Sequence, residues 1–184
     1  MASIMPIRRA LGTRTLFNLL GPLCNPARPS FQIVGTVSES HAEKLANALS
    51  AMAHIQGAYV ITGHNGWDEA TPICPFTVFE VRNGTVTRVV HDPRAFGLTP
   101  CRAEDLRGGD ARYNAMRLRR VLLGKESGAH RDTLVLGVGL GLQLMGYCGS
   151  IDAGLLRAQN AIDSGAAATL LHRLTEQPRE VVNG

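Results

Sequence analysis

A strand, helix, strand pattern over residues 31–62 constrains the fold of this chain more than any other feature. Residues 31–37 form a β-rich run, residues 57–62 form a second one, and a helical stretch lies between them. A crossover of this length joins parallel strands with right-handed connectivity. The pattern therefore predicts an α/β fold, in which helices cover a mainly parallel sheet.

The helix inside this unit has a start signal and an apolar face. Ser40 and Glu43 have the spacing of a capping box, which predicts that the helix begins near Ser40. Leu45, Leu49 and Met52 recur at helical spacing. We expect these three side chains to form one buried stripe against the sheet.

The remainder of the chain predicts a hairpin and then helices. Residues 77–82 and 85–90 alternate with a period of two around Asn83-Gly84, the pair that best suits a type I′ turn. Helices are expected near 111–122, from about Thr133 through several glycines, and near 152–163 and 166–174. The first of these has Asp110 before it and Ala111, Ala115, Leu118 and Leu122 on one face.

Length and composition set the size and class of the protein. The 184 residues, 45% of them hydrophobic, suit a single α/β domain over residues 1–177, followed by a frayed tail at 178–184. The four cysteines are widely spaced, which favours reduced thiols and a cytoplasmic protein. No apolar run is long enough to span a bilayer, and the early arginines argue against a signal peptide, so we expect no membrane association.

The charge favours a small anionic ligand. Lys and Arg number 19 against 15 Asp and Glu, a net charge of +4, and only 5% of residues are aromatic. This excess is too small to indicate nucleic-acid binding. The arginines near 112–120 leave open a basic nucleic-acid module as an alternative, for which a steep salt dependence of binding would be diagnostic.

Two segments contain residues suited to chemistry. Residues 8–26 combine three arginines with Gly21-Pro22, and a guanidinium matches a carboxylate or phosphate while glycine permits close backbone approach. Asp68 and Glu69 follow the second strand, where the ligands of parallel sheets bind, so they are placed to hold Mg²⁺. Solvated arginines and a solvated acidic turn explain the same residues without a ligand.

Three other patterns predict no site. Gly108-Gly109-Asp110 is explained by a turn with Asp110 as the N-cap. Gly137-Val138-Gly139 lacks the third glycine of a dinucleotide fingerprint, and its glycines are expected to loosen the helix by roughly 1 kcal/mol each. The six histidines show no metal-binding spacing.

Over nearly its whole length the chain resembles the anthranilate phosphoribosyltransferase family, and in particular the C-terminal part of the family's α/β domain. The matching residues, in order, are Pro6-Ile7-Arg8-Arg9, Leu11-Gly12, Arg14-Thr15, Phe17-Asn18, Leu20-Gly21-Pro22-Leu23, Asn25-Pro26, Gly66, Asp68-Glu69, Asn83-Gly84 and Gly108-Gly109-Asp110. The resemblance implies a fold like that of nucleoside phosphorylases and phosphoribosyltransferases.

The resemblance also implies an activity and a set of site residues. The family transfers a phosphoribosyl group from phosphoribosyl pyrophosphate to anthranilate in tryptophan biosynthesis. Arg8 would contact the anthranilate carboxylate, Gly21 and Pro22 would line the path of the acceptor, and Asp68 and Glu69 would bind Mg²⁺. The resemblance assigns no residue as a covalent or acid–base catalyst.

One departure from the family bears on activity. The Gly-Thr-Gly-Gly-Asp phosphate loop and the Lys-His-Gly-Asn-Arg stretch of the family do not occur in these residues. We therefore expect the isolated chain to be incomplete and to bind substrate poorly, with self-association or a complementary N-terminal half as its partner. The alternative is a non-catalytic binding or regulatory relative that keeps the motifs by descent.

Overall fold

The computed structural model describes residues 21–176 and divides the chain into two compact units. Among the described residues, the first unit comprises 21–69 and 77–90, and the second comprises 70–76 and 91–176. The single domain predicted for residues 1–177 stays a prediction. The tail at 178–184 lies outside the described residues.

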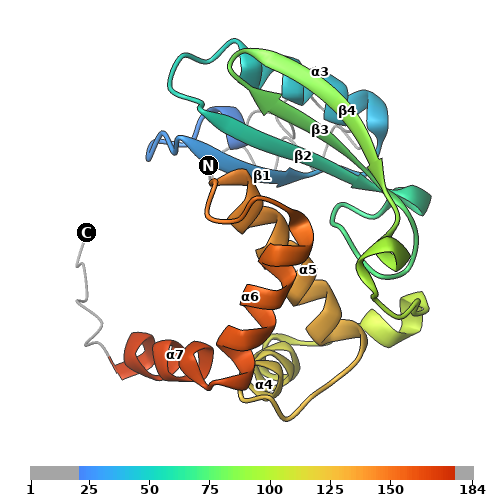
Figure 1. Cartoon of the computed structure of the whole chain (residues 1–184), viewed down its shortest axis with the longest axis vertical. Helices are drawn as coiled ribbons and strands as arrows, with labels where there is room; N and C mark the ends of the chain where they lie inside the picture. Colours follow the sequence, from blue (N-terminus) through green and yellow to red (C-terminus); the bar gives the residue numbers. More distant parts are fainter. Residues whose placement is uncertain (1–20, 177–184) are drawn as a thin grey trace, which may run out of the picture. The chain divides into compact units, whose positions relative to one another are not determined.

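A four-stranded sheet with the order β1-β2-β3-β4 forms the centre of the first unit (Figure 1). Strand β1 (Phe31–Gly35) pairs in parallel with β2 (Gly57–Gly63), and Ile33 lies opposite Tyr59. Helix α3 (Glu39–Ser50) connects them and packs on the sheet. The predicted strand-helix-strand unit and the α/β class are confirmed.

A hairpin completes the sheet. Strands β3 (Phe76–Arg82) and β4 (Thr85–His91) are joined by two residues with positive φ, Asn83 at 50° and Gly84 at 75°. Both values are those that a type I′ turn requires, so the predicted hairpin is confirmed. The tight turn makes β3 and β4 antiparallel, which gives the sheet its mixed character.

Helix α3 begins one residue before the predicted start. Its N-cap is Ser38, whose side chain accepts a hydrogen bond from the backbone N–H of His41 at 3.4 Å. Ser40 lies inside the first turn, so the predicted Ser40–Glu43 capping box is wrong. The extended backbone of Ser38, with φ of −152°, is the conformation that a cap needs.

The core of the first unit lies between α3 and the sheet. Leu45 and Leu49 are almost completely buried, and Met52 packs against the same cluster from beyond the helix end. The predicted apolar stripe is therefore confirmed. Its partners on the sheet are Ala58, Val60, Phe79 and Val81.

The second unit is helical in its described residues. After the short helices η3 (Pro93–Phe96) and η4 (Ala103–Leu106) come α4 (Ala111–Leu122), α5 (Ala129–Leu144), α6 (Ile151–Asp163) and α7 (Ala166–Glu176). These bounds confirm the four predicted helices, and Asp110 caps α4 as predicted by accepting from the N–H of Tyr113 at 2.8 Å. Each helix in residues 21–176 is too short or too polar to cross a membrane.

Helices α5 and α6 form a close antiparallel pair (Figure 1). A Cβ added at Gly139 would lie 2.5 Å from Leu155 Cδ1 and 3.0 Å from its backbone N, and one added at Gly154 would lie 2.5 Å from the carbonyl O of Gly139. The expectation that the interior glycines loosen α5 is therefore wrong for Gly139, which the helix contact requires. Nothing lies within 4 Å of a Cβ at Gly137, where the helix gains no such contact.

Helix α4 differs from the sequence expectation in its burial. Ala111, Ala115 and Leu118 are exposed and Leu122 is half-buried, whereas Val121 is the one residue of α4 that is buried. The spacing correctly predicts the helix. It does not predict that the apolar face stays uncovered within the described part of the chain.

Candidate functional site

Asp68 and Glu69 lie in a short loop that follows the carboxyl end of β2. The strand ends at Gly63, a single 3-10 turn covers residues 64–66, and Trp67 leads into the two acids. Asn65 and Gly66 both have positive φ, which reverses the chain there. The acids therefore occupy the edge of a parallel strand pair at which ligands of α/β sheets bind, as their sequence position predicts.

Two glycines at the strand ends let this loop lie directly on the sheet. A Cβ at Gly35, the last residue of β1, would lie 1.6 Å from the carbonyl O of Asp68. A Cβ at Gly63 would lie 2.7 Å from Trp67 Cβ. The backbone N–H of Gly63 also donates to the carbonyl O of Trp67 at 2.7 Å. Only glycine at position 35 leaves room for the backbone of Asp68.

The two carboxylates have no cationic partner within residues 21–176. Among residues 21–176 neither Asp68 nor Glu69 forms a side-chain hydrogen bond or an ion pair, and both residues are exposed. Partial desolvation of the Glu69 carboxyl, and then repulsion by Asp68, raise the pKa of Glu69. A divalent cation bound here would relieve that repulsion, so the pair fits Mg²⁺ electrostatically.

The described residues do not supply a full set of metal ligands at this position. No group of three His, Cys, Asp or Glu side chains suited to a metal occurs in the described residues. Magnesium is commonly held by one or two carboxylates together with water and substrate phosphates, because it gives up its hydration reluctantly. The Asp68-Glu69 pair fits that mode of binding.

The other predicted site residues are only partly described. Arg8 lies outside the described residues. Gly21 is exposed, Pro22 is half-buried, and both belong to a helical turn that ends before Cys24, whereas the sequence predicts a Gly-Pro loop. No residue of the described range 21–176 lies within 4 Å of a Cβ at Gly21. The roles of Arg8, Gly21 and Pro22 toward an acceptor stay predictions.

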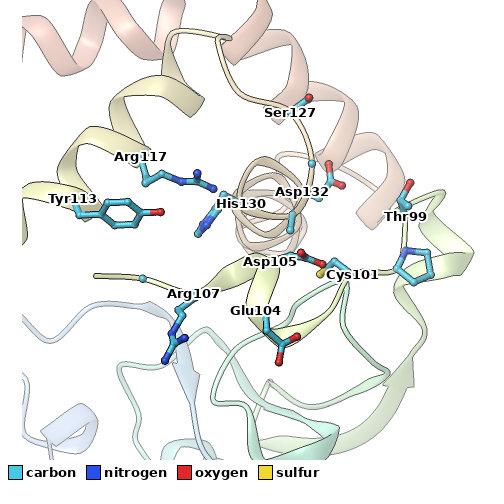
Figure 2. A pocket seen from close by; sticks show the side chains of 14 residues that line it. Thr99, Cys101, Glu104, Asp105, Arg107, Tyr113, Arg117, Ser127, His130 and Asp132 are labelled. Carbon is cyan, nitrogen blue, oxygen red and sulfur yellow. The ribbon is translucent and has the colours of Figure 1, made fainter. Parts of the chain in front are cut away.

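A large pocket lies elsewhere, in the second unit. It has a volume of about 690 Å³ between η4 and the facing ends of α4 and α5, and none of the predicted site residues lines it. Figure 2 shows Tyr113, Arg117 and His130 on one side, and Cys101 and Asp105 on the other. Arg107 lies close to Glu104 and Asp105, and Asp132 lies close to His130, so both sides of the pocket carry basic and acidic groups.

Burial shifts the pKa values of several groups in this pocket. Desolvation, followed by the nearby Arg117 charge, lowers the pKa of His130. Desolvation also raises the pKa of Asp132 and, together with repulsion by Asp105 and Asp132, that of Cys101. Asp105 itself accepts from the backbone N–H of Arg102 at 2.8 Å, which lowers its pKa. Desolvation is the largest cause of the shifts at His130, Asp132 and Cys101.

We call the loop of residues 64–69, which contains Asp68 and Glu69, the acidic loop. Sequence reasoning misses two residues that support it. The sequence pattern treats Gly35 only as part of a strand, and His64 only as a surface or satisfied histidine. A glycine at the end of a strand that precedes a helix is a signal of close backbone approach. In the structure His64 lies next to Thr77 on β3. No sequence pattern could have paired these two residues, because their contact depends on the register of the sheet.

Comparison with known proteins places this architecture in a family. Residues 1–168 match the family model described as "Glycosyl transferase family, a/b domain". A relative from Methylobacterium sp. (strain 4-46), named anthranilate phosphoribosyltransferase, is 41% identical over 174 residues, which are 95% of this chain and 51% of that protein. The chain spans about half the length of the curated relatives it matches.

Solved structures agree with the sequence match. Anthranilate phosphoribosyltransferase from Thermus thermophilus is 34% identical and superposes with a TM-score of 0.83, over 94% of this chain and 50% of that one. The enzyme from Saccharomyces cerevisiae in complex with PRPP and Mg is 27% identical, with a TM-score of 0.84, over 94% of this chain and 48% of that one. The resemblance seen in the motifs is confirmed, and the chain belongs to the glycosyl transferase family with this α/β domain.

Proposed function

We propose that this chain carries the acceptor and metal-binding half of an anthranilate phosphoribosyltransferase. The reaction is the transfer of a phosphoribosyl group from phosphoribosyl pyrophosphate to anthranilate, with release of pyrophosphate, in tryptophan biosynthesis. The observation that supports it most strongly is the Asp68-Glu69 pair, which has no counter-charge among residues 21–176 and lies against the ends of two parallel strands at Gly35 and Gly63.

The acidic loop has a defined part in such a reaction. Asp68 and Glu69 would hold Mg²⁺, which when bound offsets the negative charge that develops on the departing pyrophosphate. The remaining contribution of the protein is to orient the reactants, because holding an amine against an anomeric carbon lowers the barrier without covalent help. No residue needs to act as a covalent nucleophile.

The acceptor side rests on the first segment of the chain. Arg8 would pair with the anthranilate carboxylate through its planar fork of N–H donors. Gly21 and Pro22 would line the route to the sugar, and the space that residues 21–176 leave around Gly21 supports that role. In this proposal, the first segment of the chain binds the acceptor and the acidic loop binds the metal.

A partner is part of the proposal. Strand β1 is the edge of the sheet in the described residues, and Ile33 on it is 44% exposed. An exposed strand edge with an apolar side chain is a surface for further pairing. We propose that the complementary N-terminal half, which contributes the phosphate loop, covers this edge in the cytoplasm, and that the chain self-associates when this half is absent.

Growth of a tryptophan auxotroph that lacks this enzyme tests the function. The chain is expressed alone, or together with the half of the Thermus thermophilus enzyme that it does not cover. We expect growth without tryptophan only when both halves are present. Growth with this chain alone would contradict the two-part site.

Substitutions then test the residues. Replacing both acids, by Asp68→Asn and Glu69→Gln, removes the charges at nearly constant volume and is expected to abolish growth. Asp105→Asn, in the pocket of the second unit, is the matched control and should leave growth intact. Growth of the doubly substituted strain at the normal rate would overturn the metal assignment.

A further inference from the structure

A buried threonine joins the start of the acidic loop to the rest of the first unit. Thr77, at the beginning of β3, is completely buried, and its hydroxyl donates to Glu39 Oε1 at 2.8 Å. The hydroxyl oxygen also lies 3.5 Å from His64 Nε2. Because the one hydroxyl proton is used toward Glu39, a hydrogen bond between Thr77 and His64 requires the ring proton of His64 on Nε2.

The far end of this contact is fixed by an ion pair. Arg88 on β4 holds Glu39 through both carboxylate oxygens, with Nη2 at 2.9 and 3.0 Å and Nε at 3.2 Å. The hydrogen bonds from Arg88, and then from Thr77, lower the pKa of Glu39, so its carboxylate remains an acceptor at neutral pH. Thr77 is thus oriented by α3 and β4 together.

His64 is the residue through which the acidic loop receives this support. It is the first residue after β2, and the loop then reverses at Asn65. The far end of the loop is held by backbone contacts, since the Trp67 carbonyl accepts from Gly63 and the Asp68 carbonyl rests on Gly35. The His64–Thr77 contact is the side-chain anchor at its beginning.

We infer that His64, anchored on the Thr77 hydroxyl, is a positioning residue that sets the direction of the Asp68 and Glu69 carboxylates toward a divalent cation. This inference rests on the proposed function, which assigns the cation to that loop. His64 does not touch the cation, and its effect passes through the backbone of residues 65–67. The volume of the Thr77 side chain is irrelevant to this role, whereas its hydroxyl is essential.

Two substitutions at Thr77 separate the hydroxyl from packing. Thr77→Val keeps the volume and removes the hydroxyl, while Thr77→Ser keeps the hydroxyl and removes a methyl group. A positioning role predicts that only Thr77→Val alters the loop. A role in packing alone predicts the opposite order. His64→Ala should resemble Thr77→Val, and Thr133→Val in α5 controls for the Thr-to-Val change.

The measurement is amide NMR of the full chain labelled with ¹⁵N. Titration with Mn²⁺, whose unpaired electrons broaden nearby signals, gives an affinity from the amides of Asp68 and Glu69, and competition with Mg²⁺ shows that both ions share the site. We expect Thr77→Val and His64→Ala to weaken Mn²⁺ binding by about fivefold, the consequence of one lost hydrogen bond. Thr77→Ser and Thr133→Val should bind like the unchanged chain.

Amide relaxation of residues 64–69 without metal gives an independent reading of the anchor. Increased mobility in Thr77→Val, but not in Thr77→Ser, supports the inference. Equal loop mobility in these two variants overturns it. If the unchanged chain shows no Mn²⁺ broadening at Asp68 and Glu69, the metal assignment of the proposed function fails, and the relaxation data alone then decide whether His64 positions the loop.

Discussion

The acidic loop of the first unit and the pocket of the second unit differ in whether their charged side chains have partners. In the loop, Asp68 and Glu69 have no counter-charge among the described residues, and repulsion contributes to the raised pKa of Glu69. Near the pocket, Arg117 holds Glu126 at 2.7 Å, and Asp105 accepts from the backbone of Arg102. The second unit pairs some of its charged groups, whereas Asp68 and Glu69 stay without a counter-charge among residues 21–176.

This difference is the reason why we choose the Asp68-Glu69 loop, and not the largest described pocket, as the candidate site. The pocket has a volume of about 690 Å³, and two of its charged groups, Asp105 and Arg117, already have partners in Arg102 and Glu126. The loop of residues 64–69 encloses little space. Asp68 and Glu69 in this loop are exposed and have no counter-charge among residues 21–176, which leaves both carboxylates accessible to a cation from solution.

The largest expected effect is that of Gly35→Ala, which would abolish the distinctive geometry of the acidic loop. The new Cβ would lie 1.6 Å from a backbone oxygen, so either β1 or Asp68 must move. We expect a loss of about 3 kcal/mol in the free energy of unfolding, measured by urea denaturation, together with loss of Mn²⁺ broadening at Asp68. Gly149→Ala, where a Cβ has open space, should change neither. A Gly35→Ala chain with unchanged Mn²⁺ affinity would show that the close contact does not shape the loop.

A matched pair of glycines in α5 has the next largest effect and tests packing without the site. Gly139→Ala is expected to destabilise the chain by about 2 kcal/mol, because Leu155 and the backbone of Gly154 occupy the space. Gly137→Ala meets no atom within 4 Å and should stabilise the helix by about 1 kcal/mol. Thermal unfolding measures both, and Mn²⁺ binding at Asp68 should be unaffected in each. Equal effects of the two substitutions would mean that α5 and α6 do not pack closely at Gly139.

The smallest effect concerns pH and the pocket. The pKa of His130 lies below its usual 6.5, so the folded state binds fewer protons than the unfolded chain between these two values. Its contribution to stability is therefore present above pH 6.5 and decreases as pH falls through the folded pKa. Arg117→Gln removes the nearby charge, and an NMR titration should show the pKa of His130 rising toward 6.5. Arg112→Gln, on the same helix, is the control, and an unchanged pKa in Arg117→Gln would assign the whole shift to desolvation.

The sequence predicts the fold well because its signals are local. The strand-helix-strand unit follows from residues 31–62, and the hairpin follows from Asn83-Gly84 alone. The capping box at Ser40 is wrong because two serines lie near the helix start, and Ser38 is the one with the extended backbone and the side-chain bond to the N–H of His41. The exposed face of α4 could not be foreseen, since periodicity does not say what covers a helix.

The site is predictable in position but not in construction. Asp68 and Glu69 follow a strand closely, so their place at the sheet edge could be predicted from the chain. The supports of the loop depend on contacts between residues far apart in sequence, such as Gly35 with Asp68 and His64 with Thr77. Such contacts require the register of the strands, which no local pattern contains.

One consequence of the loop is optical. Trp67, whose carbonyl closes the turn beside the two acids, is the sole tryptophan of the 184 residues. The indole emission of the chain therefore originates entirely from the loop between Gly66 and Asp68. The wavelength and intensity of this emission report on the solvent and the charge around the acidic loop. No dye or engineered label is needed to follow changes there.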